Sequence, residues 1–177
     1  MRVGAWPDEP DRVRVTVTPA AVPVPLDEQP GLVLRPYRLG PAGGERHKFA
    51  DRRWLDAAEA GLGPGEAALL VDDRGRLLET TRSCVFVVRG GILSTPPLDG
   101  RILAGTGRRA VLDALEAAGT PCDLVAATTA DLAGADGMFL VNAVRGIQWV
   151  RAAPGVAWAG PDPVTRWVAK LLDRDPG

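Results

Sequence analysis

The stretch LVDDRGRLLETTRSCVFVV, residues 70–88, decides the fold. Its turn DDRG (72–75) stands between two runs of apolar residues, and Asp and Gly favour tight connections between strands. AALLV (67–71) leads into this turn, and ILSTP (92–96) follows a second turn, RGG. The alternation of apolar runs and turn residues predicts an antiparallel meander in the middle of the chain.

Strands and helices are expected on both sides of this meander. RVRVTVT (12–18) alternates polar residues with Val, which is the period of a half-buried strand. Asp162 followed by Pro163 is typical of a helix start. The other expected elements are strands at 32–39, within 122–129, at 138–143 and at 147–150, helices at 51–60 and 108–118, the second ending at Gly119, and a helical turn at 130–135. The pattern indicates an α+β fold with an antiparallel or mixed, barrel-like sheet and flanking helices.

Composition and charge exclude several classes of protein. The chain has 177 residues, which is enough for one domain with a core, and its net charge of −1 gives no electrostatic footprint for nucleic acid or an anionic membrane. No apolar run approaches the length of a membrane span. Cys84 and Cys122 are too few for a disulfide framework, which favours a reduced, cytoplasmic location. No metal-ligand spacing occurs, and a single histidine, His47, disfavours a hydrolase triad.

Lys48 stands out because almost all the basic residues of the chain are arginines. The only other lysine among 21 Lys and Arg residues is Lys170. A lysine amine can condense with an aldehyde, whereas a guanidinium is a poor nucleophile, and neighbouring arginines such as Arg52 and Arg53 would lower the pKa of Lys48 by like-charge repulsion. Taken alone, Lys48 is better explained as a plain surface lysine on a basic loop, because a single residue is a weak signal.

Three further segments add to the interpretation of Lys48. Glu79 precedes an apolar strand, Gly105, Thr106 and Gly107 stand at a helix start, and Asn142 ends a strand in a turn. Backbone N–H groups at a helix start bind anions. A lysine for the aldehyde, a carboxylate for the pyridine nitrogen and a phosphate cup are what pyridoxal 5′-phosphate requires.

The sequence resembles the class IV, fold-type IV pyridoxal-phosphate enzymes, which include branched-chain and D-amino-acid aminotransferases and aminodeoxychorismate lyase. The resemblance runs from about residue 12 to residue 152. Its motifs are KFADRR, LVDDRGRLLETTRSCVF, LSTPPLDGRILAGTGRRAVL and DLAGADGMFLVNAVRGIQWV. The Lys-x-x-Asp-Arg form and the Asn-x-x-Arg-Gly-Ile turn are more similar to the lyase branch, and Arg53 replaces the tyrosine of branched-chain aminotransferases.

The resemblance implies a role for each matching residue. Lys48 would be the catalytic Schiff-base lysine, and Glu79 would pair with the pyridine nitrogen. The phosphate cup would be formed by Gly105, Thr106 and Gly107, with the turn at Asn142 and Ala143 against the phosphate and the substrate. Family members are typically homodimers and act on amino-acid-like substrates or aminodeoxychorismate.

The sequence departs from the family pattern at two residues and at its N-terminus, where a misassigned start, a truncation and a genuine reduction are all open. Cys84 stands where Asn is usual, and Ala143 where a Ser or Thr hydroxyl usually helps to hold the phosphate. Relatives carry a smaller N-terminal domain, so residues 1–11 are expected to be a disordered or remnant segment and 12–177 the large domain. The resemblance implies an aminotransferase or 4-amino-4-deoxychorismate lyase. The alternative is a degenerate, non-catalytic member that serves as a binding or assembly domain.

Each site residue also has a simpler interpretation. Glu79 could be an exposed strand charge, and Asn142 only a turn residue. Thr106 could merely cap a helix at 108 whose Arg108 and Arg109 are solvated. Cys84 is better explained as a small core residue than as a nucleophile.

Overall fold

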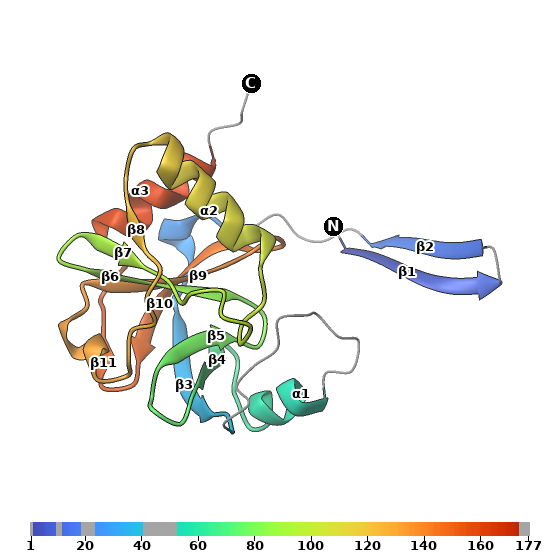
Figure 1. The fold of residues 1–177 in the computed structure, drawn as a ribbon, viewed down its shortest axis with the longest axis horizontal. Helices are drawn as coiled ribbons and strands as arrows, with labels where there is room; N and C mark the ends of the chain where they lie inside the picture. The colour runs from blue at the N-terminus through green and yellow to red at the C-terminus, as the bar shows by residue number, and fades with distance from the viewer. Residues whose placement is uncertain (1, 10–11, 19–23, 41–52, 174–177) are drawn as a thin grey trace.

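The computed structural model describes residues 2–9, 12–18, 24–40 and 53–173 (Figure 1). Strands β1 (Arg2–Glu9) and β2 (Arg12–Thr18) pair antiparallel in a two-stranded sheet of their own. The predicted strand at 12–18 is therefore confirmed. The segment expected to be disordered or a remnant contains a regular strand, and the domain boundary at residue 12 stays a prediction.

Six strands close a mixed barrel, which confirms the expected fold class (Figure 1). Around the barrel the order is β10, β3, β4, β5, β6 and β9, and β9 closes it by pairing with both β6 and β10. Strand β3 runs parallel to β4 and β10, and the other pairs are antiparallel. The strands are β3 (Leu32–Arg38), β4 (Glu66–Val71), β5 (Leu77–Thr80), β6 (Cys84–Arg89), β9 (Gly137–Asn142) and β10 (Gly146–Ala153).

The remaining elements surround this barrel and follow the sequence expectations closely. Asp162 caps the last helix, since its carboxylate accepts from the N–H groups of Val164 and Thr165 at 2.9 and 3.0 Å. Gly119, with φ 66°, follows the end of α2 as predicted. The strand expected within 122–129 has only two residues. These elements are η1 (Leu26–Glu28), α1 (Arg53–Glu59), β7 (Ile92–Ser94), α2 (Thr106–Ala117), β8 (Cys122–Asp123), η2 (Asp131–Gly134), β11 (Val156–Ala157) and α3 (Pro163–Leu172).

Alternation along the strands divides the apolar residues between the inside and the outside of the barrel. Val85 and Val87 belong to a buried cluster that draws on all six barrel strands. Phe86 points the opposite way, stacks on Phe139 with ring centroids 4.9 Å apart, and lies in a second cluster under α2 and α3. A third cluster lies under α1 and includes Ile102. The helices thus bury the outer faces of a barrel whose interior is already filled.

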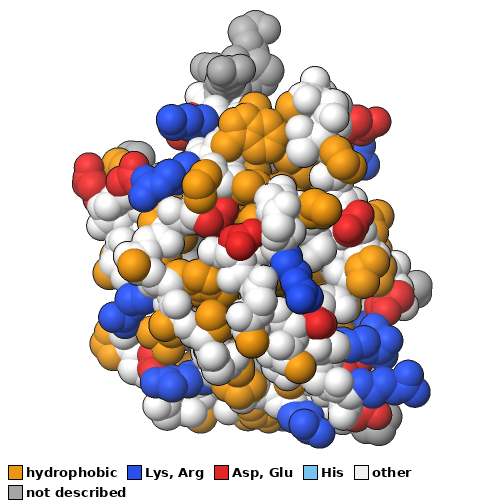
Figure 2. All heavy atoms as spheres, turned by 90° about the vertical axis from the view of Figure 1, so that its left-hand side faces the viewer, with side chains coloured by type: hydrophobic (Ala, Val, Ile, Leu, Met, Phe, Trp, Pro, Cys, Tyr) orange, Lys and Arg blue, Asp and Glu red, His pale blue; other side chains and the backbone are white. Residues whose placement is uncertain are grey.

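The outer surface carries charges of both signs among scattered hydrophobic side chains on the face shown in Figure 2. Within the described ranges, no helix combines the length and the apolar character needed to cross a bilayer. Three tryptophans contribute to the core. Trp149 is buried, and Trp158 and Trp167 pack against the first and second clusters.

Candidate active site

Lys48 lies in the segment 41–52, outside the described residues, so its predicted role stays a prediction. The other predicted site residues are described. They lie on three segments that the fold brings together: the end of β5, the start of α2 and the turn between β9 and β10.

Glu79 lies near the end of β5, directly opposite Cys84 on β6. Its half-buried carboxylate receives one described donor, the N–H of Leu103, at 3.3 and 3.4 Å from its two oxygens. Burial raises the pKa of Glu79 to about 7, against a smaller lowering by that hydrogen bond. An exposed strand charge, the simpler interpretation, is therefore wrong, because this carboxylate is desolvated and receives only one long hydrogen bond from the described residues.

The predicted backbone cup lies at the start of α2. Gly105 occupies the N-cap position, no side chain caps the helix, and no acidic residue stands in its first turn. The first intrahelical bond runs from the N–H of Arg109 to the oxygen of Gly105 at 3.0 Å, so the N–H groups of Thr106 and Gly107 remain available. Thr106 is the first helical residue and makes no cap bond, so the capping interpretation is also wrong.

Gly107 packs the start of α2 against the end of β9. A Cβ added at this glycine would lie 3.0 Å from the carbonyl carbon of Asn142 and 3.1 Å from its Cα. Such an approach is tighter than most Cβ contacts in proteins, so a side chain at this position would require the backbone of Asn142 to shift. In Figure 1 the lower end of α2 lies beside the turn that joins β9 to β10.

Asn142 organises that turn. Its Oδ1 accepts from the N–H groups of Val144 and Arg145 at 2.9 and 2.8 Å, which confirms its interpretation as a turn residue. Its Nδ2 donates to the hydroxyl of Ser83 at 2.8 Å. Ala143 follows with an exposed methyl group and supplies no hydroxyl. The Ser83 bond fastens the turn after β9 to the turn between β5 and β6.

Cys84 is a buried core residue, as expected. Burial, helped by the charge of Glu79, raises the pKa of its thiol to about 11, so the nucleophilic thiolate is scarce at neutral pH. A Cβ added at Gly105 would lie only 2.7 Å from the sulfur of Cys84. Residue 84 therefore sits directly behind the cup and beside Glu79.

The expectation that Arg108 is solvated is wrong. Only 4% of this residue is exposed; Nη2 donates to the oxygen of Pro96 at 3.0 Å, and Nε has no hydrogen-bond partner among the described residues. Burial lowers the pKa of its guanidinium. Arg109, by contrast, is exposed and pairs with Asp113. The sequence gives no sign of this difference, because neighbouring helix positions look alike until the packing face is known.

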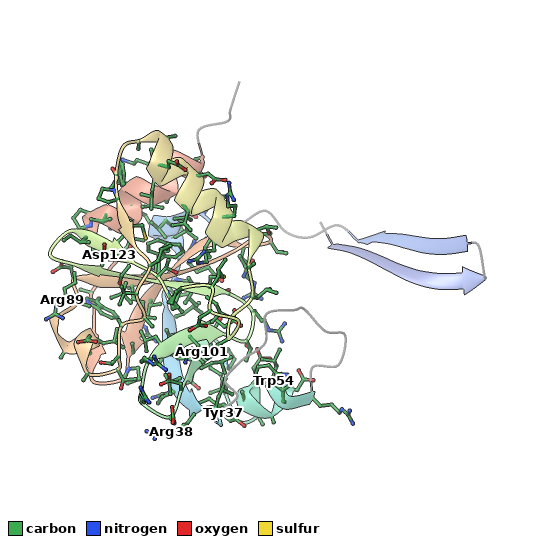
Figure 3. The ribbon with its side chains drawn as sticks, viewed as in Figure 1. Tyr37, Arg38, Trp54, Arg89, Arg101 and Asp123 are labelled. Atoms are coloured by element: carbon green, nitrogen blue, oxygen red, sulfur yellow. The ribbon has the colours of Figure 1, made fainter. Side chains whose placement is uncertain are left out.

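A charged network holds the loop that carries Leu103. Arg101, labelled in Figure 3, donates from Nη1 to Asp72 at 2.8 Å and from Nη2 to Asp99 at 2.6 Å. Asp72 belongs to the turn between β4 and β5 and is 3% exposed. Arg101 thus fixes this loop to the barrel two residues before Leu103, whose N–H donates to Glu79. The sequence motifs do not predict this support.

The converging groups suit a ligand that is cationic at one end and anionic at the other. A protonated ring nitrogen would supply the donor that Glu79 lacks, and a phosphate would take the open N–H groups of the cup. The orphaned Nε of Arg108 adds buried positive charge in the same first turn of α2. Across the described part of the chain, no cluster of His, Cys, Asp or Glu could hold a metal ion.

Comparisons with known proteins show which family this chain is similar to. The family model described as amino-transferase class IV matches residues 8–153. A proposed branched-chain-amino-acid aminotransferase of Methanocaldococcus jannaschii is 34% identical over 77 residues, which are 44% of this chain and 27% of that protein.

Solved structures extend the similarity to the fold. The 4-amino-4-deoxychorismate lyase of Pseudomonas aeruginosa is 27% identical, with a TM-score of 0.77 over 92% of this chain and 62% of that one. A hypothetical aminotransferase of Mycobacterium tuberculosis in its PLP-bound form is 25% identical, with a TM-score of 0.62 over 81% and 54%. The chain therefore spans less than two thirds of the length of these relatives.

Proposed function

Because the chain belongs to the class IV aminotransferase family, we propose that it binds pyridoxal 5′-phosphate and acts on an amino-acid-like substrate. The observation that carries the proposal is the convergence of Glu79, the start of α2 and the Asn142 turn on one side of the barrel. Lys48 enters the proposal through its family motif alone.

The described residues fit the cofactor at both of its ends. Glu79 would hold the pyridine nitrogen, and the N–H groups of Thr106 and Gly107 would hold the phosphate, with Asn142 and Ala143 beside it. When bound, the cofactor supplies an electron sink that makes the α-hydrogen of the substrate acidic.

Two side chains of the protein would stabilise charge and transfer protons. The Glu79 carboxylate would become a stable anion once a cationic N–H faces it, which reverses the effect of burial on its pKa. The amine of Lys48 would first hold the aldehyde carbon and then, released by the substrate amine, take the α-proton as a general base. The overall reaction would be transamination or the elimination of pyruvate from aminodeoxychorismate.

The lyase reaction has one specific point of support. The lyase of Pseudomonas aeruginosa combines 27% identity with a TM-score of 0.77. Ala143, which lacks the hydroxyl usual in the family, instead supports the alternative of a non-catalytic binding or assembly domain. A homodimer, typical of the family, belongs to the enzyme proposal.

Cofactor trapping tests the proposal. The full chain is mixed with pyridoxal phosphate and reduced with borohydride, and the labelled peptide is identified by mass spectrometry. We expect a pyridoxyl group on Lys48 that disappears in Lys48→Ala and persists in Lys170→Ala, the matched control for the only other lysine. Labelling of Lys170 alone, or equal labelling of Lys48→Ala, would reject the enzyme reading in favour of the non-catalytic alternative.

A further inference from the structure

Arg108, in the first turn of α2, is a buried cation that no carboxylate among the described residues neutralises. Its one hydrogen bond within this part of the chain joins Nη2 to the oxygen of Pro96, and Nε has no partner there. The electrostatic neighbours of the guanidinium are the thiols of Cys84 and Cys122, which burial keeps neutral by raising their pKa to about 11. A buried charge without a counter-ion is unfavourable, and an anion that binds nearby would compensate it.

The charge of Arg108 lies close to the predicted cup. Thr106 and Gly107, whose N–H groups remain available, directly precede Arg108 in the same helical turn. Burial dominates the raised pKa of the Cys84 thiol, but the Arg108 guanidinium is near enough to oppose it. A Cβ added at Gly105 would lie 2.7 Å from the same sulfur. The guanidinium is therefore on the core side of the cup, while the cup residues themselves are more exposed.

A rigid anchor fixes the position of this charge. Pro96, which accepts from Arg108 at 3.0 Å, follows the end of β7. The preceding residue, Thr95, is buried and donates from Oγ1 to the oxygen of Val85 on β6 at 2.8 Å. The N–H of Thr95 donates to the oxygen of Asp123 on β8 at 2.9 Å. Since two strands hold the acceptor, the guanidinium has a fixed place before any ligand binds, as electrostatic preorganisation requires.

We infer that Arg108 is a positioning residue, whose fixed charge acts through the cup and raises its affinity for the dianion of a phosphate monoester. The inference rests on the proposed function and adds the buried group that favours a doubly charged anion at this helix start. The aligned peptide dipoles of α2 attract the same anion. Two unit charges about 8 Å apart, at an effective dielectric constant of about 20, still change affinity by about tenfold or more.

Binding of cofactor analogues that lack the aldehyde tests this role. Pyridoxine 5′-phosphate, and pyridoxine without the phosphate, are titrated calorimetrically into the full chain, Arg108→Met, Arg108→Lys and Arg109→Met. Arg109 is the matched control, because it is the next residue of α2, is exposed and pairs with Asp113. We expect Arg108→Met to weaken pyridoxine 5′-phosphate about tenfold or more and to leave pyridoxine unchanged. Arg108→Lys, which keeps the charge, and Arg109→Met should stay within about threefold of the parent.

Urea unfolding separates this role from a purely structural one. Without ligand, Arg108→Met should be at least as stable as the parent, since it replaces an uncompensated buried charge by an apolar side chain. Inorganic phosphate should raise the urea midpoint of the parent and of Arg108→Lys, and should raise that of Arg108→Met much less. A structural arginine would instead lower stability when replaced and would weaken both analogues alike.

Three results would overturn the inference. One is equal affinity of the parent and Arg108→Met for pyridoxine 5′-phosphate. Another is a loss of stability in Arg108→Met together with a parallel loss of both analogues, which would make Arg108 a structural residue. The third is a folded Arg108→Lys that binds as poorly as Arg108→Met, which would assign the effect to the bond with Pro96 instead of the charge.

These outcomes are distinguishable from a failure of the proposed function. None of the three ligands can condense with a lysine. A chain that binds phosphate in an Arg108-dependent way, yet shows no borohydride labelling at Lys48, would reject the enzyme proposal alone. A parent that binds neither pyridoxine 5′-phosphate nor inorganic phosphate would reject both proposals.

Discussion

Two carboxylates lie near opposite ends of β5 and have opposite surroundings. Asp72, in the turn before the strand, accepts four hydrogen bonds of 2.6–2.9 Å from Arg74, Arg76 and Arg101. Burial alone would raise the pKa of Asp72, but these bonds outweigh it and lower the pKa to about 2. Glu79, near the other end, receives one long bond, and burial raises its pKa to about 7.

The contrast separates a carboxylate that holds the fold from one that the proposed function assigns to a ligand. Stability from Asp72 is fully present above pH 3.8 and is lost as the pH falls through about 2, an effect of about 2 kcal/mol. Glu79 has the opposite sign: its protonated form favours the folded state, so stability falls by up to about 3 kcal/mol as the pH rises from 4.5 to 7. A cationic partner would reverse that loss.

Asp72→Asn tests the structural carboxylate and should have the largest effect on stability. The amide would face the donors of Arg76 and Arg101 with an N–H₂ group, so we expect a loss of about 2–4 kcal/mol in urea unfolding at pH 7. Asp73→Asn, in the same turn but exposed, should change the unfolding free energy by less than about 0.5 kcal/mol. Equal effects at the two positions would refute the structural role of Asp72.

Glu79→Gln tests the carboxylate that the proposal assigns to a ligand and should change stability in the opposite direction. Without the cofactor, the variant should be more stable than the parent by about 1–2 kcal/mol at pH 7, and its stability should no longer decline between pH 4.5 and 7. Urea unfolding at several pH values measures both. A less stable variant at pH 7, with the decline retained, would show that Glu79 is a structural carboxylate like Asp72.

Cys84→Asn tests whether residue 84 contributes to the raised pKa of Glu79, and it should have the smallest effect on stability of the three substitutions. An amide N–H₂ opposite Glu79 adds the donor that a thiol provides only weakly, so the pKa of Glu79 should fall below 7 and the stability decline should shift to lower pH. The pKa of Glu79 is followed by NMR of its side-chain carbon, with Cys122→Asn as the control for a second free thiol. An unchanged titration would mean that residue 84 does not tune Glu79.

The sequence predicted the local elements well because local chemistry determines them. The turn DDRG at 72–75, the cap formed by Asp162 and the helix end at Gly119 each depend on contacts within a few residues along the chain. The closing of β9 between β6 and β10, and the parallel approach of β3 to β4 and β10, depend on distant pairings that periodicity does not encode.

The residues of the candidate site likewise divide into those that local motifs predict and those that depend on long-range packing. Glu79, the cup at 105–107 and Asn142 could be read from family motifs in the sequence. The N–H of Leu103, the burial of Arg108 and the bond from Asn142 to Ser83 could not, since each depends on which surfaces meet.

Closure of the barrel by its last strands also sets an order of events for the newly made chain. Gln29, just before β3, donates to the oxygen of Ile147 on β10, 118 positions later. Long-range pairings of this kind form slowly, because the loop between the partners must be ordered first. The meander that carries Glu79 can form early, but the Asn142 turn cannot lie against Ser83 and α2 until the sequence up to β10 has been synthesised. Binding of the proposed cofactor is therefore expected to be a late step, which follows completion of the barrel.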